Sequence, residues 1–285
     1  MKFLFENWRR YLTEDSKALG IGAQGIQERL KGYSDYTWIF FDTETMGLGP
    51  SKDQLTEIAA MAVNPNTGEV LGQFNEKIKL DSASLARLNE PDSAERVDWE
   101  TQQSKSKRRL KEPQDILRLT RYGEKGRGFV DEQSVLQQFE EFIDSFPNPL
   151  LVAQNASFDM KFVNTRKEER LKKYPVFDTL PFIQYHVIPM LKAIETSGDG
   201  KIRQRADEIL GKLFSRGFYS ASLGKVAKAF GIDVEGWHNA LADVKMTIDV
   251  FNALKRVAEY AATVNLEYRP EQEKVIKKKK AWKGF

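Results

Sequence analysis

Four carboxylates in three separate segments are the residues of this sequence best suited to chemistry. Asp42 and Glu44 stand two positions apart where the apolar run 39–41 ends, and the alternation of side chains along a strand would place both on one face. Asp159 follows a second apolar segment and opens an expected helix, and Asp243 lies near the start of another. Each has an ordinary explanation by itself, because acids at strand ends are commonly solvated and acids in first helical turns complement the helix dipole.

His238 stands just before the Asp243 helix and adds a group that can accept a proton near neutral pH. It is one of only two histidines, and by itself it would be interpreted as an ordinary, partly buried side chain. Together, four acids and a histidine suit phosphodiester hydrolysis. Two Mg²⁺ or Mn²⁺ ions about 3.5–4 Å apart stabilise the attacking and leaving oxygens, and an imidazole with a pKa of about 6.5 takes the proton of the attacking water. The cations are also needed electrostatically, since clustered carboxylates raise one another's pKa.

The elements that must position these residues alternate between apolar strands and amphipathic helices. Residues 36–41 and 54–63 have the pattern of buried strands, and the turn residues 64–68 predict that 70–80 returns as the third strand of a meander. A short fourth strand is expected over 150–153. The predicted helices span 135–146, 157 onward, 179–195, 202–214, 222–230 and 239–261. This order indicates an α/β fold in which helices flank a mixed β-sheet.

The helix expected over 239–261 presents an apolar stripe after Asn239, which can cap it. The stripe consists of Leu241, Val244, Ile248 and Phe251. At 3.6 residues per turn, Asp243 lies roughly 120° from the centre of this stripe. We therefore expect the Asp243 carboxylate to face a cleft instead of the main core.

Three motifs, in this order, resemble the DEDD exonucleases of the histidine-bearing subgroup, the superfamily of the proofreading ε subunit of bacterial DNA polymerase III. Residues 42–48 (DTETMGL) are similar to the first motif of that family, residues 155–159 (NASFD) to the second and residues 238–243 (HNALAD) to the third. Shorter matches lie between the motifs, at Glu57, 178–180 and 222–223. The resemblance extends over roughly residues 36–262.

This resemblance implies an RNase H-like sheet and a 3′→5′ exonuclease that uses two divalent cations, Mg²⁺ or Mn²⁺. By similarity, Asp42 bridges the two ions, and Glu44 and Asp243 complete one of the two sites. Asp159 serves the second ion, and His238 is the general base.

The resemblance also implies a set of contacts to the terminal nucleotide. The residues concerned are Thr45, Met46, Gly47, Leu48, Glu57, Asn155 and Phe158. The sequence departs from the common pattern at Gln154, where many relatives carry a histidine, so the resemblance implies no substrate contact at this position. The stretch between the first two motifs is also longer than in compact members, because it contains a basic insertion.

Charge is distributed unevenly along the 285 residues, whose net charge is +3. Residues 104–128 hold nine basic and three acidic side chains, and residues 274–285 hold six lysines. Basic appendages on an acidic body indicate a polyanionic partner. We expect that partner to be nucleic acid with a 3′ end, single-stranded and DNA in preference to RNA. A polymerase or another replication or repair protein is the expected protein partner, and the tail could instead dock such a protein or be disordered.

Composition and length bound the remaining possibilities. We expect an N-terminal extension (1–34), an exonuclease domain (35–262) with a basic insertion (81–128), and a basic C-terminal tail (263–285). The absence of cysteine excludes disulfides, zinc–thiolate sites and cysteine nucleophiles. The longest apolar run, 58–63, is far shorter than the ~18 residues of a membrane span, so we expect a soluble, cytoplasmic protein that is not exported and contacts no membrane. The competing hypothesis is a scaffold of the same fold that binds nucleic acid or a polymerase without cleaving.

Overall fold

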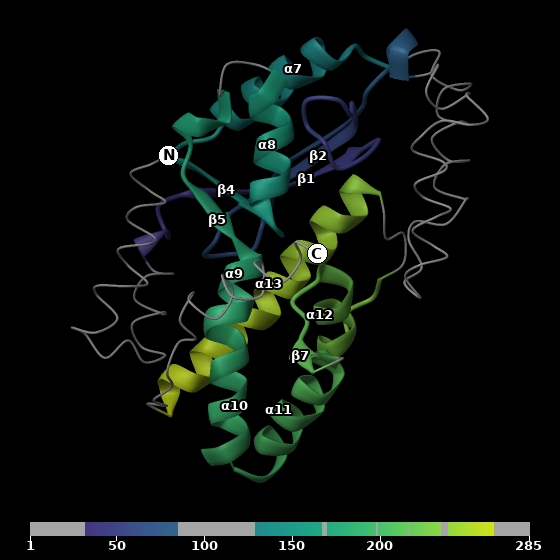
Figure 1. Ribbon diagram of the computed structural model, residues 1–285. Coiled ribbons are helices and arrows are strands. Elements are labelled where there is room, and N and C mark those ends of the chain that lie inside the picture. The colour runs from purple at the N-terminus through teal and green to yellow at the C-terminus, as the bar shows by residue number, and fades with distance from the viewer. Residues whose placement is uncertain are drawn as a thin grey trace, which may run out of the picture.

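The computed structural model describes residues 32–84, 129–166, 170–197, 199–215, 217–234 and 239–264. Its centre is a five-stranded sheet with the order β3-β2-β1-β4-β5 (Figure 1). The strands are β1 (Thr37–Thr45), β2 (Leu55–Val63), β3 (Val70–Lys77), β4 (Pro149–Ala153) and β5 (Val176–Asp178). The first three form an antiparallel meander, whereas β4 runs parallel to β1 and β5 parallel to β4. The mixed sheet confirms the predicted fold class.

Helices cover both faces of this sheet (Figure 1). One face carries α7 (Glu132–Asp144) and α8 (Ala156–Arg166), and the other is crossed by α13 (Ala240–Thr263). After α8 the chain forms η1 (Arg170–Lys173), and after β5 it forms α9 (Thr179–Phe182), the π-helix η2 (Ile183–Val187), α10 (Ile188–Ser197), α11 (Gly200–Leu213), β6 (Phe214–Ser215), β7 (Phe218–Tyr219) and α12 (Leu223–Phe230). Within the described ranges, no helix combines the length and apolar character that crossing a membrane requires.

The central strand β1 is buried on both faces because its alternate side chains enter two different cores. On one face, Trp38 and Phe40 pack against Phe251 of α13, with ring centroids 4.8 and 5.8 Å apart. On the other face, Phe41 packs against Phe139 of α7 at 5.8 Å. The neighbouring strand β2 is buried along its whole length. Asp42 and Glu44 therefore extend from the end of a strand that is packed on both sides.

The predicted elements are present, with some of their ends displaced. The third strand was expected to reach residue 80, but β3 ends at Lys77. Ile78 N still donates to Thr56 O of β2 (2.9 Å), and Ile78 also forms a parallel bridge with Val130. The first predicted helix begins earlier than expected, since Asp131 caps it by accepting a hydrogen bond from Ser134 N (3.0 Å). The predicted N-terminal extension, basic insertion and basic tail lie almost entirely outside the described residues.

On α13, Asp243 lies beside the acids of β1, and the predicted apolar stripe is less buried than expected at two of its positions. Asp243 is 7% exposed and lies on the buried face of α13 together with Val244 and Phe251. Leu241 and Ile248, which the sequence placed within the apolar stripe, are only half-buried. The face that α13 packs against β1 and β2 therefore includes Asp243. The carboxylate points at the end of the sheet and not away from it.

Candidate active site

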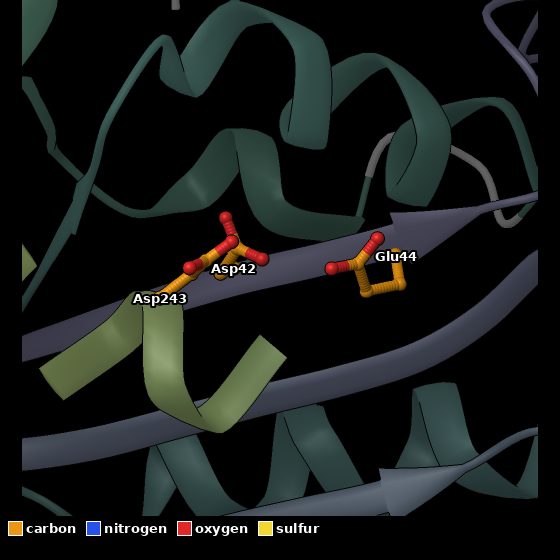
Figure 2. Close-up of side chains that lie close together, drawn as sticks. All are labelled: Asp42, Glu44 and Asp243. Atoms are coloured by element: carbon orange, nitrogen blue, oxygen red, sulfur yellow. The ribbon is translucent and has the colours of Figure 1, made fainter. Parts of the chain in front are cut away.

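Three carboxylates meet where the end of β1 lies next to the start of α13 (Figure 2). Asp42 and Glu44 come from β1, and Asp243 comes from the first turn of α13. One ligand oxygen from each residue lies within 4.8 Å of the other two. A single divalent cation can contact all three at this spacing, and carboxylate oxygens are the donors that Mg²⁺ and Mn²⁺ prefer. The donor set and its geometry therefore fit a divalent cation.

Asp159 adds a fourth carboxylate from the first turn of α8. Its Oδ1 atom accepts hydrogen bonds from the backbone N of Thr43 (3.0 Å) and from Thr43 Oγ1 (2.7 Å). Thr43 lies between Asp42 and Glu44 on β1, so these bonds attach the start of α8 to the strand that carries the other acids. Asp159 is 3% exposed. It is thus fixed beside the three clustered carboxylates, and of the neighbouring charges that raise the pKa of Asp42 its charge has the largest effect.

Two of these carboxylates, Asp42 and Asp159, have a raised pKa. Burial raises the pKa of Asp42 well above its ordinary value, and the charges of Asp159, Asp243, Glu44 and Glu57 raise it further. Burial also raises the pKa of Asp159 to about 7, although its hydrogen bonds from Thr43 act in the opposite direction. A group of acids in this condition becomes fully ionised at neutral pH only when cations neutralise it. The raised pKa values therefore favour a bound divalent cation, as the spacing of the three carboxylates does.

Glu57 lies beside these acids, and Asp42, Glu44, Glu57, Asp159 and Asp243 are together called the acidic cluster. It stands directly opposite Glu44 in the register of β1 and β2 and is 2% exposed. Like charges in this position repel across the strands. Asn239 donates from Nδ2 to Glu57 Oε1 (3.3 Å) and caps α13 by accepting from Ala242 N (3.2 Å). One amide thus connects Glu57 to the helix that carries Asp243, and contact between Glu57 and substrate stays a prediction.

The segment between β1 and β2 forms a tight loop with Leu48 exposed. Met46 N donates across the loop to the residue before β2 (3.0 Å), and Thr45 Oγ1 donates to Gly47 O (2.6 Å). Position 47 requires glycine, because a Cβ atom there would lie 2.5 Å from Asp53 Oδ2. Leu48 is 83% exposed. An apolar side chain this open, just after the strand that bears the acids, is available to a nucleotide.

An ion pair between Arg166 and Glu132 holds the base of this loop. Arg166 Nε lies 2.6 Å from Glu132 Oε1, and the two side chains are only 12% and 18% exposed. The guanidinium also donates to the carbonyls of Pro50 (2.8 Å) and Asp53, and Glu132 Oε1 accepts from Leu55 N (3.1 Å). The pair therefore joins the start of α7 and the end of α8 to the loop. The sequence analysis missed it, because two residues 34 positions apart at ordinary helix ends carry no local signal.

The turn between β4 and α8 has left-handed backbone at Asn155, with φ of 63°. Asparagine tolerates this conformation better than most residues. Asn155 N donates to Asp178 Oδ1 (2.9 Å), which also accepts from Leu180 N (3.0 Å) and so caps α9. The Asn155 side chain is exposed, and Phe158 is half-buried with its ring 4.9 Å from that of Phe162. Both residues named by the second motif therefore lie at the turn that leads to Asp159.

Residues 37–208 match the family model described as the 3′–5′ exoribonuclease Rv2179c-like domain, which is more than half of the chain. The chain belongs to this family. It therefore carries a DEDD-type 3′–5′ exonuclease domain, as its three motifs predicted.

Other relatives share parts of this exonuclease domain. The DNA polymerase III PolC-type proteins of Clostridium perfringens and Bacillus subtilis are each 25% identical to it, over 228 and 239 residues. These alignments cover 79% and 82% of this chain but 12% of each polymerase. E. coli exonuclease I in complex with a dT13 oligonucleotide shares the fold, with a TM-score of 0.51 at 18% identity over 79% of this chain and 43% of that one. The exonuclease domain thus spans a small part of the polymerases and less than half of exonuclease I.

The exonuclease domain uses Gln154 as a structural link. Its Nε2 donates to Ala221 O (2.6 Å), and its Oε1 accepts a hydrogen bond from Thr179 Oγ1. Both groups of the amide are therefore engaged within the fold. Many relatives carry a histidine at this position. In this chain, Gln154 connects the end of β4 to the segment that precedes α12.

The exonuclease domain has two histidines, of which the structure describes one. His238, the expected general base, lies outside the described residues, which resume at Asn239. His186 is 2% exposed within η2, and its ring lies 5.8 Å from that of Phe182. His186 is thus a core residue, and the expected role of His238 stays a prediction.

Proposed function

We propose that this exonuclease domain hydrolyses phosphodiester bonds at the 3′ end of nucleic acid with the help of two divalent cations, Mg²⁺ or Mn²⁺. The observation that carries the proposal is the group formed by Asp42, Glu44 and Asp243, whose ligand oxygens lie within 4.8 Å of one another. When bound, the cations would supply charge stabilisation to the attacking and leaving oxygens. Burial and then the charges of neighbouring acids raise the pKa of Asp42, and a bound cation would favour its ionised form, which supports this assignment.

The side chains divide the work of this reaction in the proposed mechanism. Asp42 would be shared by the two ions, and Glu44 and Asp243 would help to hold one of them while Asp159 would serve the second. Thr43 keeps Asp159 in position through its two hydrogen bonds. An imidazole nitrogen of His238 accepts the proton of the attacking water, a step worth about 10²–10⁴-fold in rate.

The substrate contacts form a second part of the proposal. The loop residues Thr45, Met46, Gly47 and Leu48 would meet the terminal nucleotide, with Glu57, Asn155 and Phe158 lining the same site. The exposure of Leu48 supports its share in this contact, since an open apolar side chain can pack on a base.

We propose single-stranded 3′ ends as the substrate, with DNA favoured and RNA as the other candidate. The family description speaks of an exoribonuclease, whereas the fold relative was solved with a DNA oligonucleotide. The domain would span 35–262, with the basic insertion (81–128) and the basic tail (263–285) contacting phosphates. A polymerase or another replication or repair protein would be its partner in the cytoplasm.

An end-labelled cleavage assay tests the proposal. Matched single-stranded DNA, duplex DNA and RNA are incubated with the full chain in Mg²⁺, in Mn²⁺ and in a chelator. We expect shortening from the 3′ end that requires the metal and is lost in Asp243→Asn. Asp249→Asn is the matched control, because Asp249 is an exposed acid on the same helix.

Two results would contradict the proposal. Shortening from the 5′ end would show the wrong direction of cleavage. Binding of nucleic acid without hydrolysis in Mn²⁺ would support a non-cleaving scaffold. A His238→Ala variant that retains full activity would remove only the general base from the mechanism.

A further inference from the structure

The hairpin of β6 and β7 exposes two phenylalanine rings. Phe214 is 52% exposed and Phe218 is 44% exposed. Phe214 pairs with Tyr219 across the hairpin, with ring centroids 5.2 Å apart. Lys192 of α10 places its ammonium 4.6 Å from the centre of the Tyr219 ring. Lys192 therefore packs on one face of the Tyr219 ring, whereas about half of each phenylalanine side chain is open to solvent.

The chain around this hairpin is positively charged. Residues 209–232 contain Lys212, Arg216, Lys225 and Lys228 and no aspartate or glutamate. Lys212 and Lys228 are exposed, and Lys225 is half-buried. Aromatic rings interleaved with basic side chains are the usual composition of surfaces that bind single-stranded nucleic acid, because the rings stack on bases and the cations meet phosphates.

The hairpin is connected to the active-site edge of the sheet. Its stem is closed by a hydrogen bond from Ser220 N to Leu213 O (2.9 Å), and the next residue, Ala221, is bound by Gln154 at the end of β4. The ends of β4 and β1 lie at the same edge because these strands are parallel. Phe218 stands three residues before Ala221, which corresponds to about 10 Å of extended chain. The rings are thus within reach of nucleotides a few steps from a 3′ end held at Asp42.

We propose that the β6–β7 hairpin is a stacking platform for single-stranded nucleic acid upstream of the terminal nucleotide. Bases stack on Phe214 and Phe218, and Lys212 and Lys228 contact the neighbouring phosphates. The inference rests on the proposed function, because it places the platform along the strand that enters the active site. It predicts that long single strands bind more tightly than dinucleotides, and that the hairpin causes the difference.

The experiment compares rings with aliphatic side chains at the same two positions. Phe214→Leu/Phe218→Leu keeps apolar bulk and removes the flat faces, whereas Phe214→Tyr/Phe218→Tyr keeps the faces. Val70→Ala/Leu71→Ala is the matched control, since these apolar residues of β3 are 49% and 43% exposed on the opposite edge of the sheet. KM and kcat are measured on a single strand of about 12 nucleotides, a length within known site sizes, and on a dinucleotide.

We expect the double leucine variant to raise KM for the long strand about 10- to 100-fold, as expected for lost base stacking, and to leave dinucleotide hydrolysis unchanged. The double tyrosine variant and the β3 control should stay within about twofold of wild type on both substrates, since tyrosine keeps the stacking face. Fluorescence anisotropy of the labelled strand, with a chelator to prevent cleavage, should show the same ranking.

The platform is overturned if the leucine variant binds the long strand as wild type does, or if it loses activity equally on both substrates. It is also overturned if the substitutions change the sedimentation of the protein and not its affinity for the strand, because the rings would then serve self-association. Failure of the proposed function looks different, since wild type would cut neither substrate in metal. The anisotropy ranking still decides about the platform in that case.

Discussion

The exonuclease domain contains two groups of buried charge near the carboxyl end of β1, and they are built in opposite ways. In the acidic cluster of Asp42, Glu44, Glu57, Asp159 and Asp243, burial and the neighbouring acids raise the pKa of Asp42. In the clamp of Arg166 and Glu132, a cation and an anion lie 2.6 Å apart and both also bond to backbone. The clamp is neutral by itself, whereas the cluster is not.

The two regions differ in where the charge that neutralises them comes from. The clamp neutralises its charges internally, so it can hold the loop of Leu48 under any condition that leaves the fold intact. In the acidic cluster, burial and four neighbouring acids raise the pKa of Asp42, and a divalent cation would relieve the repulsion among these acids. We infer that substitutions in the cluster separate activity from stability, and that substitutions in the clamp reduce both.

The largest effect is expected for Asp42→Asn. We expect activity to fall about a thousandfold or more, because cation-assisted charge stabilisation contributes several kcal/mol. The free energy of unfolding of the metal-free protein should rise by on the order of 1 kcal/mol, since one repelling charge is removed. Activity and chemical denaturation are measured on the same preparations. A loss of activity accompanied by a loss of stability would break the contrast between cluster and clamp.

The second-largest effect is expected in the way the stability of the metal-free protein depends on pH. The pKa of Asp159 is raised to about 7 in the folded protein, so the folded state retains a proton that the unfolded chain releases at a pH of about 4. The metal-free protein should therefore lose stability as the pH rises from about 4 to about 7, by a few kcal/mol at about 1.4 kcal/mol per pKa unit. Thermal denaturation is compared in chelator and in Mg²⁺. Equal slopes in both, or an unchanged slope in metal-free Asp159→Asn, would contradict this account.

Arg166→Met should break the clamp and cost about 3 kcal/mol of stability, because Glu132 is left with an unpaired and largely buried charge. KM should rise as well, since the loop of Leu48 loses its support. Arg166→Met/Glu132→Met should recover part of the stability by removing the stranded charge. Arg205→Met is the matched control and should change stability by no more than about 0.5 kcal/mol, because the Arg205–Glu208 pair is 48% and 45% exposed. A control effect as large as that of Arg166→Met would refute the clamp.

The smallest effect tests how the acidic cluster is connected to α13. Asn239→Ala removes the cap of this helix and should cost about 1 kcal/mol of stability. Asn239→Ser should restore the cap but not the amide that donates to Glu57. We expect both variants to bind Mn²⁺ about tenfold more weakly, because both lose the amide that connects Glu57, beside the metal-binding acids, to the helix that carries Asp243. Titration calorimetry checks the affinity, and a serine variant with normal Mn²⁺ binding would assign Asn239 to capping alone.

The sequence by itself determined the motifs and the side of β1 from which the acids project. Alternation along a strand is a local property, so it assigns Asp42 and Glu44 to one face whatever packs around the strand. Local periodicity also predicted the first four strands and the main helices, and with them the mixed sheet, whereas the short strands β5, β6 and β7 were not predicted. His238 is known from the sequence alone, since it lies outside the described residues.

Only the tertiary structure decided which charges meet and which are neutralised. The helix period placed Asp243 away from the apolar stripe, but the packing of α13 on β1 and β2 buries it beside Asp42. Glu57 joins the cluster because strand register sets it opposite Glu44, and Arg166 meets Glu132 because α7 and α8 lie on the same face of the sheet. These contacts join residues distant in sequence, and their energies depend on burial, which no local pattern of residues specifies.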